Sequence, residues 1–565
     1  MTIAAEADRM TEADATFREI SEGEWESRLA DLGDEHYGGE QVDHFLPDVS
    51  DAAWQARARR WREAMEAVEA VAESQLSDRM RIDRAVYLDQ LQTLVAQVEH
   101  RLHERPANAD SAFWTDHQGR ARRVNWSLLD AQRYLAQLAQ LPRWFEQHIE
   151  NMRSGIARGY GPARVSMQGR QEPVRSVAEA ASAGDTPYWA AFADLPADAL
   201  TSTGAPLLDR ARAVLEEQVI PAYRTLLAFL EDEYLPGLPE SIAAVDGPDG
   251  AAFYRSALRE YTTTDMTPEE IHELGLELVA GILEEMRAIA QETGFDGDET
   301  RLIEHLRTDP QFYATTPEQL LKEAAWVCKR FDGVVHRWFG QTPRMRFGII
   351  EPPADLAPFY TFGRGGLDRY TLNTYNLPAR PLYSLPALTL HEAAPGHCFQ
   401  IALAHEAAGM PGYRRRVYIS AYGEGWALYT ERLGVEMGIY QTPFELMGML
   451  SFQMWRAVRL VIDPGMHALG WSRERAQAFL RDHTAIAEHE IVTEVDRYIA
   501  WPGQATAYAI GQATILRLRR LAEQELGAAF DIRAFHDLVL GLGSVPLTVL
   551  ESEVHRAIER WRSAA

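Results

Sequence analysis

The sequence predicts a mainly α-helical protein with two large helical lobes, a deep cleft and one small β-sheet. Apolar residues recur at helical spacing along most of the 565 residues. Strand-like runs occur in one place, at residues 345–350 and 369–374. A chain of this length exceeds the usual size of one domain and can bury a sizeable core.

The helical pattern is clearest where a start signal precedes it. Thr267-Pro268-Glu269-Glu270 is a capping box with Pro at the first helical position, and Thr316-Pro317-Glu318-Gln319 repeats this device. The predicted helices cover residues 51–75, 78–104, 126–150, 267–293, 316–338, 443–461, 472–483, 504–527 and 545–562.

Stretches rich in Gly and Pro divide the chain. Residues 153–175 and 234–252 are predicted to be long surface connections. A boundary near 245–260 separates an N-terminal helical lobe, residues 1–250, from a second lobe, residues 251–565, and we expect the two lobes to be interleaved. The small sheet, residues 345–374, falls in the second lobe, with a flexible loop expected at Gly363-Arg364-Gly365-Gly366 between its strands.

Charge and cysteine content exclude several classes of protein. The net charge of -27 argues against nucleic acid and anionic membranes as partners. The two cysteines, Cys328 and Cys398, rule out a disulfide framework and suit a reducing compartment. The first residues resemble no signal peptide and no run of 18 apolar residues occurs, so we expect a cytoplasmic protein. The oligomeric state stays open, a homodimer included.

The segment from Thr389 to His397 carries the strongest chemical signal. In the zinc-hydrolase motif H-E-x-x-H, two His four positions apart face one metal and the Glu activates water. Here His397 follows His391 by six positions, which would turn it about 240° round a regular helix. Pro395 and Gly396 lie between them, and an internal Pro kinks or breaks a helix. A kink that returns His397 to His391 would complete a zinc site with Glu392 as general base.

A third ligand must come from elsewhere, because catalytic zinc usually has three protein ligands and one open position. Glu424 lies in a segment with helical spacing and is the predicted ligand, which places the site within residues 391–431. Glu431 follows seven positions later on a similar face and is predicted to orient a ligating His.

The alternative is that these polar residues are simply satisfied inside a helical core. That view leaves a Pro-Gly break between two His unexplained. Three other His-Glu pairs lack a second His at a useful spacing and are interpreted as ordinary surface or core positions: His272-Glu273, His405-Glu406 and His489-Glu490.

Four motifs together resemble a known family. They are His-Glu-x-x-Pro-Gly-His at 391–397, Glu-Gly-Trp-Ala-Leu-Tyr at 424–429, Asp-Pro-Gly-Met-His-Ala-Leu-Gly-Trp at 463–471, and Arg497-Tyr498 with Pro502-Gly503-Gln504-Ala505 and Tyr508. In this order they are similar to the bacterial family labelled domain of unknown function 885, which itself resembles gluzincin-type zinc metallopeptidases of the thimet oligopeptidase group. The resemblance is strongest from about Tyr254 onward. Many members carry a second His where this chain has Cys398.

The resemblance implies a large metallopeptidase-like fold, one zinc ion held by His391, His397 and Glu424, and a role for each further motif. Tyr508 is expected to donate to the oxyanion that forms during hydrolysis, with His467 as the alternative donor. Asp463 is expected to orient residues of the site without binding the metal itself. The residues expected to bind substrate are Asn373, Arg497, Tyr498 and Gln504. An edge strand beside the zinc helix would hold an extended substrate.

Three functions remain open. The first is a zinc peptidase that cleaves short peptides with Glu392 as general base. The second is a zinc hydrolase of a non-peptide amide or ester in small-molecule metabolism, which would use the same residues. The third is a non-catalytic helical scaffold, which the presence of His391, Glu392, His397, Glu424 and Tyr508 argues against.

Overall fold

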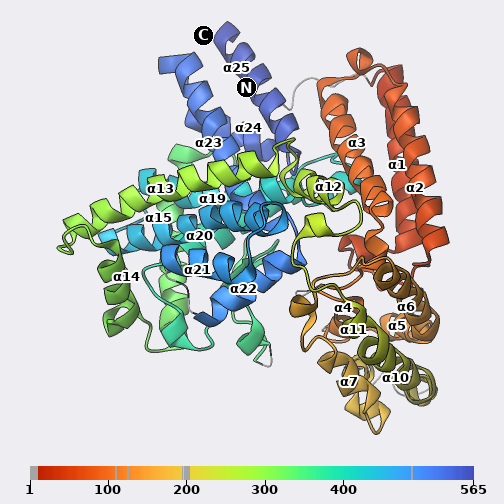
Figure 1. Cartoon of the computed structure of the whole chain (residues 1–565). Coiled ribbons are helices and arrows are strands. Elements are labelled where there is room, and N and C mark those ends of the chain that lie inside the picture. Colours follow the sequence, from red (N-terminus) through yellow and green to blue (C-terminus); the bar gives the residue numbers. More distant parts are fainter. Residues whose placement is uncertain are drawn as a thin grey trace. The chain divides into compact units, whose positions relative to one another are not determined.

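Helices dominate the computed structural model, which describes residues 10–108, 111–123, 126–193, 195, 204–354, 356–484, 486 and 488–564 (Figure 1). The mainly α-helical fold class predicted from the sequence is confirmed. By internal contacts the chain forms two units, residues 1–253 with 496–501, and residues 254–495 with 502–565. In the described part of the chain, no helix is both long and apolar enough to cross a membrane.

The first unit consists of helices around an aromatic-rich core. Its main helices are α1 (Glu12–Leu32), α2 (Asp51–Glu69), α3 (Asp78–Glu99), α4 (Phe113–Arg120), α5 (Leu128–Leu138), α6 (Leu141–Ala157), α7 (Glu172–Ala178), α8 (Ala190–Ala193), α9 (Gly204–Val214), α10 (Ile220–Phe229) and α11 (Leu235–Gly237). Helix α12 (Gly250–Thr262) begins in this unit and ends in the next. Tyr134, Tyr188 and Tyr223 are fully buried in the core.

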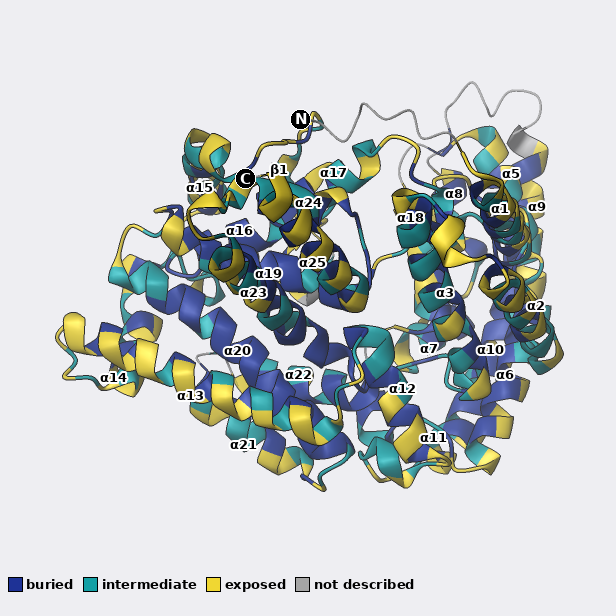
Figure 2. Cartoon of the chain, turned by 90° about the horizontal axis from the view of Figure 1, so that it is seen from above, coloured by how far each residue is buried: buried dark blue, intermediate teal, exposed yellow. Residues whose placement is uncertain are grey.

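The second unit contains the sheet and the remaining helices. These are α13 (Pro268–Glu292), α14 (Glu299–Thr308), α15 (Pro317–Trp338), α16 (Leu385–Glu392), α17 (His397–Glu406), α18 (Gly412–Arg415), α19 (Ser420–Glu436), α20 (Pro443–His467), α21 (Arg473–His483), α22 (Glu488–Ala500), α23 (Ala507–Leu526), α24 (Ile532–Gly541) and α25 (Leu547–Ala564). The last turn of α22 belongs to the first unit. Helix α20 is buried along nearly its whole length (Figure 2), and α13 packs along it.

Close helix packing depends on glycine where α19 meets α23. A Cβ on Gly425 would lie 2.5 Å from the backbone of Gly511, and a Cβ on Gly511 would lie 1.9 Å from the carbonyl oxygen of Ala421. Contacts this short exclude any larger residue without movement of the backbone. The two glycines therefore fix the position of α19, which carries Glu424 and Glu431.

The small sheet has three strands in the order β1-β3-β2. Strand β1 (Gly348–Ile350) is parallel to β3 (Arg369–Leu372), and β2 (Gly363–Gly365) is antiparallel to β3. The predicted strand runs at 345–350 and 369–374 thus contain β1 and β3. The flexible loop predicted at Gly363-Arg364-Gly365-Gly366 is wrong for its first three residues, because Gly363–Gly365 form edge strand β2. Glycine disfavours strands intrinsically, but tertiary pairing with β3 overrides that preference.

Most predicted helices are present, with differences where Pro decides the boundary. The predicted helix 126–150 is two helices, because α5 ends at Leu138 and α6 restarts at Leu141 with Pro142 in its first turn. The predicted connection 153–175 is partly helical, since α6 continues to Ala157 and α7 begins at Glu172, again with Pro in its first turn. Pro fits the first turn, where its missing N–H has no partner to lose.

Candidate metal centre

Between the two histidines of the motif the helix is interrupted, and the chain turns so that His397 comes back beside His391. Helix α16 ends at Glu392, and α17 starts at His397. A Cβ on Gly396 would lie 1.8 Å from the carbonyl oxygen of His391, so only glycine fits this turn. The indole N–H of Trp426 donates to the Pro395 carbonyl at 2.8 Å. As a result the rings of His391 and His397 lie 5.0 Å apart at 88°.

Glu424 of α19 approaches both histidines. Its Oε2 lies 3.5 Å from His391 Nε2 and 3.4 Å from His397 Nε2. One ligand atom from each of the three residues lies within 4.8 Å of the others. Zinc bonds of about 2.0–2.1 Å in a tetrahedron place ligand atoms about 3.4 Å apart. The two distances to Glu424 match such an edge, so the donor set fits zinc in both chemistry and spacing.

A buried carboxylate orients the first histidine. Glu431 Oε1 lies 2.8 Å from His391 Nδ1, which leaves His391 Nε2 for a metal. The amide of Gln453 donates to Glu431 Oε2 at 3.1 Å, and Gln512 in turn donates to Gln453 at 2.6 Å. This chain of contacts joins α16, α19, α20 and α23, and it fixes the ring of His391 through its Nδ1 side.

The charges of the cluster stabilise one another in the absence of a metal. Burial acts to lower the pKa of His391, but hydrogen bonds to Glu424 and Glu431 outweigh it and raise the pKa to about 9. Burial opposes ionisation of Glu424, yet His397 and His391 hold the pKa of that carboxyl well below its usual range. A cation is therefore favoured at this position, whether protons or a metal supply it.

Glu392 lies at the end of α16 beside strand β2. Its Oε2 accepts a hydrogen bond from the backbone N–H of Gly365 at 2.6 Å. A Cβ on Gly365 would lie 2.0 Å from the Glu392 carbonyl oxygen and 2.8 Å from His397 Cβ, so glycine permits this approach. Glu392 is partly exposed, whereas His391 and His397 are buried, so water can reach its carboxylate.

Tyr418 is a member of the site that the sequence analysis missed. It lies in the short linker between α18 and α19, and its hydroxyl donates to Glu424 Oε1 at 3.1 Å. Its ring meets that of His397 at 6.4 Å. A Cβ on Gly423 would lie 2.2 Å from the Tyr418 hydroxyl, so this glycine makes room for the ring. The only sequence signal was a tyrosine close before the Glu424 helix.

Tyr508, the predicted oxyanion donor, lies near the start of α23 and is partly buried. The guanidinium of Arg459 lies 4.7 Å from its ring centre and that of Arg456 lies 6.0 Å from it. Burial and the charge of Glu424 raise the pKa of Tyr418, and the charge of Tyr508 adds to this effect. The sequence signal for these arginines was a pair of cations three positions apart in a long, mostly apolar helix.

Asp463 and His467 lie at the C-terminal end of α20. The Asp463 carboxylate accepts hydrogen bonds from the Tyr254 hydroxyl at 2.6 Å and from the Gly503 N–H at 3.1 Å. It thus anchors the turn that precedes Tyr508. His467 is fully buried, and its ring lies 5.3 Å from that of Tyr254. Both residues are more than two turns of α20 beyond Gln453, and their predicted roles stay predictions.

Asn373 requires a correction. Its side-chain amide donates to the carbonyls of Ala357 and Tyr360 at 3.0 and 2.9 Å, and its oxygen accepts from the Tyr375 N–H at 3.0 Å. The side chain is completely buried. Both amide hydrogens already have partners, so we assign Asn373 to the support of this loop and no longer to substrate binding.

Three predicted substrate-binding residues lie around residue 500. Arg497 and Tyr498 belong to the first unit, where the Arg497 guanidinium lies 4.9 Å from the Tyr498 ring centre. Gln504 begins a short 3₁₀ turn in the second unit and is buried. Their contact with a substrate stays a prediction.

Cys398, next to His397, is no metal ligand candidate in this structure. Its thiol donates to the Arg369 carbonyl of β3 at 3.4 Å. Burial raises its pKa to about 12, so the thiolate that a metal needs is disfavoured. It also lines a cavity of about 560 Å³ with Phe331, Phe347 and Phe399.

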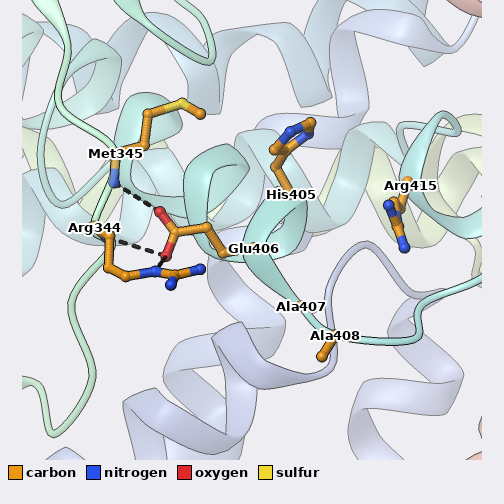
Figure 3. Close-up of a pocket in the computed structure, with 7 residues that line it drawn as sticks. All are labelled: Arg344, Met345, His405, Glu406, Ala407, Ala408 and Arg415. Carbon is orange, nitrogen blue, oxygen red and sulfur yellow. Dashed lines mark hydrogen bonds and ion pairs between the residues drawn. The ribbon is translucent and has the colours of Figure 1, made fainter.

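The remaining His-Glu pairs have separate surroundings. Glu406 accepts hydrogen bonds from the backbone N–H groups of Arg344 and Met345 at 3.1 and 2.7 Å, in a pocket of about 630 Å³ that His405 also lines (Figure 3). Glu406 thus fixes the segment that leads into β1. His272 Nδ1 lies 2.8 Å from the Val461 carbonyl oxygen, which holds α13 against α20.

Comparison with known proteins decides the family. The family model described as "Bacterial protein of unknown function (DUF885)" matches residues 29–554. The chain belongs to the DUF885 family. A comparison with curated proteins found no match to this chain.

Two solved structures resemble this DUF885 protein over almost its whole length. The crystal structure of a "putative lipoprotein" from Colwellia psychrerythraea is 26% identical with a TM-score of 0.87, and the match covers 98% of this chain and 100% of that chain. A "putative lipoprotein of unknown function" from Shewanella oneidensis is 17% identical with a TM-score of 0.69, covering 95% and 99%. The second likeness concerns the fold alone.

Proposed function

We propose that this DUF885 protein is a zinc-dependent hydrolase that cleaves peptide bonds of short peptides. The observation that carries the proposal is the arrangement of His391, His397 and Glu424. The two distances from Glu424 to the histidines match an edge of a tetrahedral zinc site, and all three ligand atoms lie within 4.8 Å of one another. Glu392 lies on the same helix end as His391 and is partly exposed. The resemblance to gluzincin-type metallopeptidases belongs to this proposal as well.

The chemistry divides between the metal and the protein. A bound zinc ion would polarise the scissile carbonyl and make a water molecule more acidic. Glu392 would take a proton from that water and deliver it to the leaving nitrogen as the C–N bond breaks. The hydroxyl goes to the acyl carbon, so one water is added across the amide. Tyr508 would donate a hydrogen bond to the carbonyl oxygen as negative charge develops there.

The geometry of strand β2 favours an extended peptide as substrate. Gly366 N–H donates to the Arg369 carbonyl and Asn373 N–H donates to the Phe362 carbonyl, so the even-numbered residues of this strand face β3. In an antiparallel pair the alternate residues then face away. Gly363 and Gly365 therefore point their backbone groups to the other edge, where Gly365 meets Glu392. A peptide added along this edge would pass beside Glu392.

Metal analysis combined with a peptide library tests the proposal. We expect about one zinc per chain and cleavage of short peptides by the wild type. His391→Gln should lose zinc, whereas His405→Gln, a histidine replacement in the pocket of Figure 3, should retain it. Hydrolysis of metabolite amides or esters without peptide cleavage would favour the non-peptide hydrolase. A wild type that binds no metal would favour the scaffold.

Cellular location is part of the same proposal. Acidic composition and two unpaired cysteines favour the cytoplasm. The description of the Colwellia psychrerythraea structure as a putative lipoprotein favours a lipid-anchored location instead. Fractionation of cells that express the native gene decides between them, since an anchored protein follows the membrane fraction and dissolves with detergent.

A further inference from the structure

Arg456 is a buried cation whose charge no carboxylate balances in the described part of the chain. Its relative exposure is 7%. Its Nη1 donates to the Phe452 carbonyl one turn earlier at 3.4 Å, and its Nε has no hydrogen-bond partner among the described residues. A buried charge without a counterion is costly, because the charge has lost its hydration and gained no partner. Such a group calls for an explanation beyond packing.

Comparison with Arg459 of the same helix sharpens the point. Arg459 is equally buried, but its Nη2 lies 3.1 Å from Glu494 Oε2. Arg456 instead lies among aromatic rings, 4.9 Å from Phe452, 5.0 Å from Trp455 and 6.0 Å from Tyr508. A cation is attracted to the electron-rich face of an aromatic ring. The rings hold the guanidinium in place, and its buried Nε–H has no hydrogen-bond partner among the described residues.

Arg456 lies on the side of α20 that faces the metal centre. Gln453, three positions earlier, donates to Glu431, which in turn holds His391. Residues three apart share a helix face and are separated by about 4.5 Å along the axis. Arg456 also lies 6.0 Å from the ring centre of Tyr508, the residue predicted to donate to the oxyanion. Its place on the helix and this ring contact put Arg456 on the side of the predicted site.

We propose that Arg456 binds the C-terminal carboxylate of the substrate, so that the enzyme acts on peptides with a free C-terminus close to the scissile bond. This rests on the proposed peptidase function. The planar guanidinium presents parallel N–H donors that match the two oxygens of a carboxylate. A peptide amide at the same place would leave the charge uncompensated and lose the charge-assisted bonds. Arg456 thus determines specificity, while Glu392 and the metal ligands carry the chemistry.

The test uses matched tripeptides with a free acid or an amide at the C-terminus. With the metal-loaded protein we expect kcat/KM for the acid to exceed that for the amide by about 10-fold or more, the scale for a lost charged contact. Arg456→Met should remove this preference by slowing cleavage of the acid, mainly through KM, far more than cleavage of the amide. Arg456→Lys keeps the charge but lacks the planar guanidinium. Its preference for the acid should lie between those of the wild type and Arg456→Met.

Arg517→Met is the control, because Arg517 is half-exposed on α23 and pairs with Glu551 at 2.9 Å. It should keep the wild-type preference. Equal cleavage of acid and amide by the wild type, or an equal loss on both in Arg456→Met, would overturn the inference.

A binding measurement separates this inference from the proposed function. Titration calorimetry with the best-cleaved tripeptide, or with trialanine when none is cleaved, is performed on Glu392→Gln with and without Arg456→Met. The inference requires that the acid binds more weakly once Arg456 is replaced and that the amide binds alike. If the peptides bind in this pattern but are not cleaved, the hydrolase proposal is rejected and the anion site is kept. If the peptides are cleaved but do not bind in this pattern, the hydrolase proposal is kept and the anion site is rejected.

Discussion

Glu431 Oε1 lies 2.8 Å from His391 Nδ1, and Glu431 is completely buried. Because this contact sets the tautomer and the ring orientation of His391, we expect Glu431→Gln to weaken zinc binding about 10- to 100-fold. Competition with a chelator measures the affinity. Glu436→Gln is the control, because Glu436 is an exposed residue of the same helix that pairs with Arg519. Unchanged affinity in Glu431→Gln would leave Glu431 a purely structural residue.

Glu392→Gln should keep zinc and the fold but slow hydrolysis by about 10²-fold or more, since the substitution removes a proton acceptor and hardly changes shape. The Gly365 N–H can still donate to the amide oxygen, so strand β2 should hold its position. Turnover is measured at saturating substrate alongside zinc content. Full activity would mean that another group activates the water.

Tyr508→Phe should lower kcat by about 10²–10³-fold with little change in KM, because the hydroxyl would act mainly as charge develops on the carbonyl oxygen. The ring remains, so its contacts with Arg456 and Arg459 persist and the melting temperature should hold. An unchanged kcat would transfer the role to His467 or to Tyr418. A large fall in melting temperature would identify Tyr508 as a packing residue.

Tyr418 and Gly423 should affect metal binding through one hydrogen bond. Tyr418→Phe removes the donor to Glu424 and should weaken zinc binding by about 10-fold, as loss of outer contacts to a ligand does. Gly423→Ala should have the same effect, because its Cβ would occupy the place of the Tyr418 hydroxyl.

In the double variant Tyr418→Phe, Gly423→Ala, the second change should add little, since the hydrogen bond is already absent. The visible spectrum of bound cobalt reports the ligand geometry alongside affinity. Additive losses would mean that Gly423 acts on the helix and not through Tyr418.

Acid should destabilise the first unit through His148. This side chain is buried and stacked on Phe113 with ring centres 3.9 Å apart, and burial lowers its pKa to about 3. The unfolded chain takes up this proton near pH 6.5 and the folded chain does not, so stability is full above pH 6.5 and falls between there and pH 3.

The slope is about 1.4 kcal/mol per pH unit for one such histidine. Relative to the wild type, His148→Phe should therefore gain stability as the pH falls from 6 to 4, measured by hydrogen exchange in α6. Replacement of the exposed His44 by Phe serves as the control. Parallel pH curves for wild type and His148→Phe would contradict the assignment.

Local sequence patterns gave the helices, the position of the small sheet and the membership of His391 and Glu392 in one helix. Each of these follows from spacing within a few residues, where apolar periodicity, capping residues and Pro act directly on the backbone. Even the break at Pro395-Gly396 was visible, because Pro cannot continue a helix without loss of a hydrogen bond.

The sequence did not show in which direction the chain turns at that break. It also did not show which residues distant in the sequence contact the site. That His397 turns back to His391 depends on the contact of Gly396 with the His391 carbonyl and on Trp426. Strand β2 exists because β3 pairs with it. The amide of Asn373 is likewise engaged by a loop carbonyl that the local sequence did not reveal.

The sequence by itself therefore determined the fold class, the family and the residue types of the candidate metal site. Only the tertiary structure decided that Tyr418 joins Glu424 and that Arg456 lies one turn from the residue that supports Glu431. The physical reason is that helix packing brings together residues tens of positions apart, and periodicity within one helix carries no information on which other helix it meets.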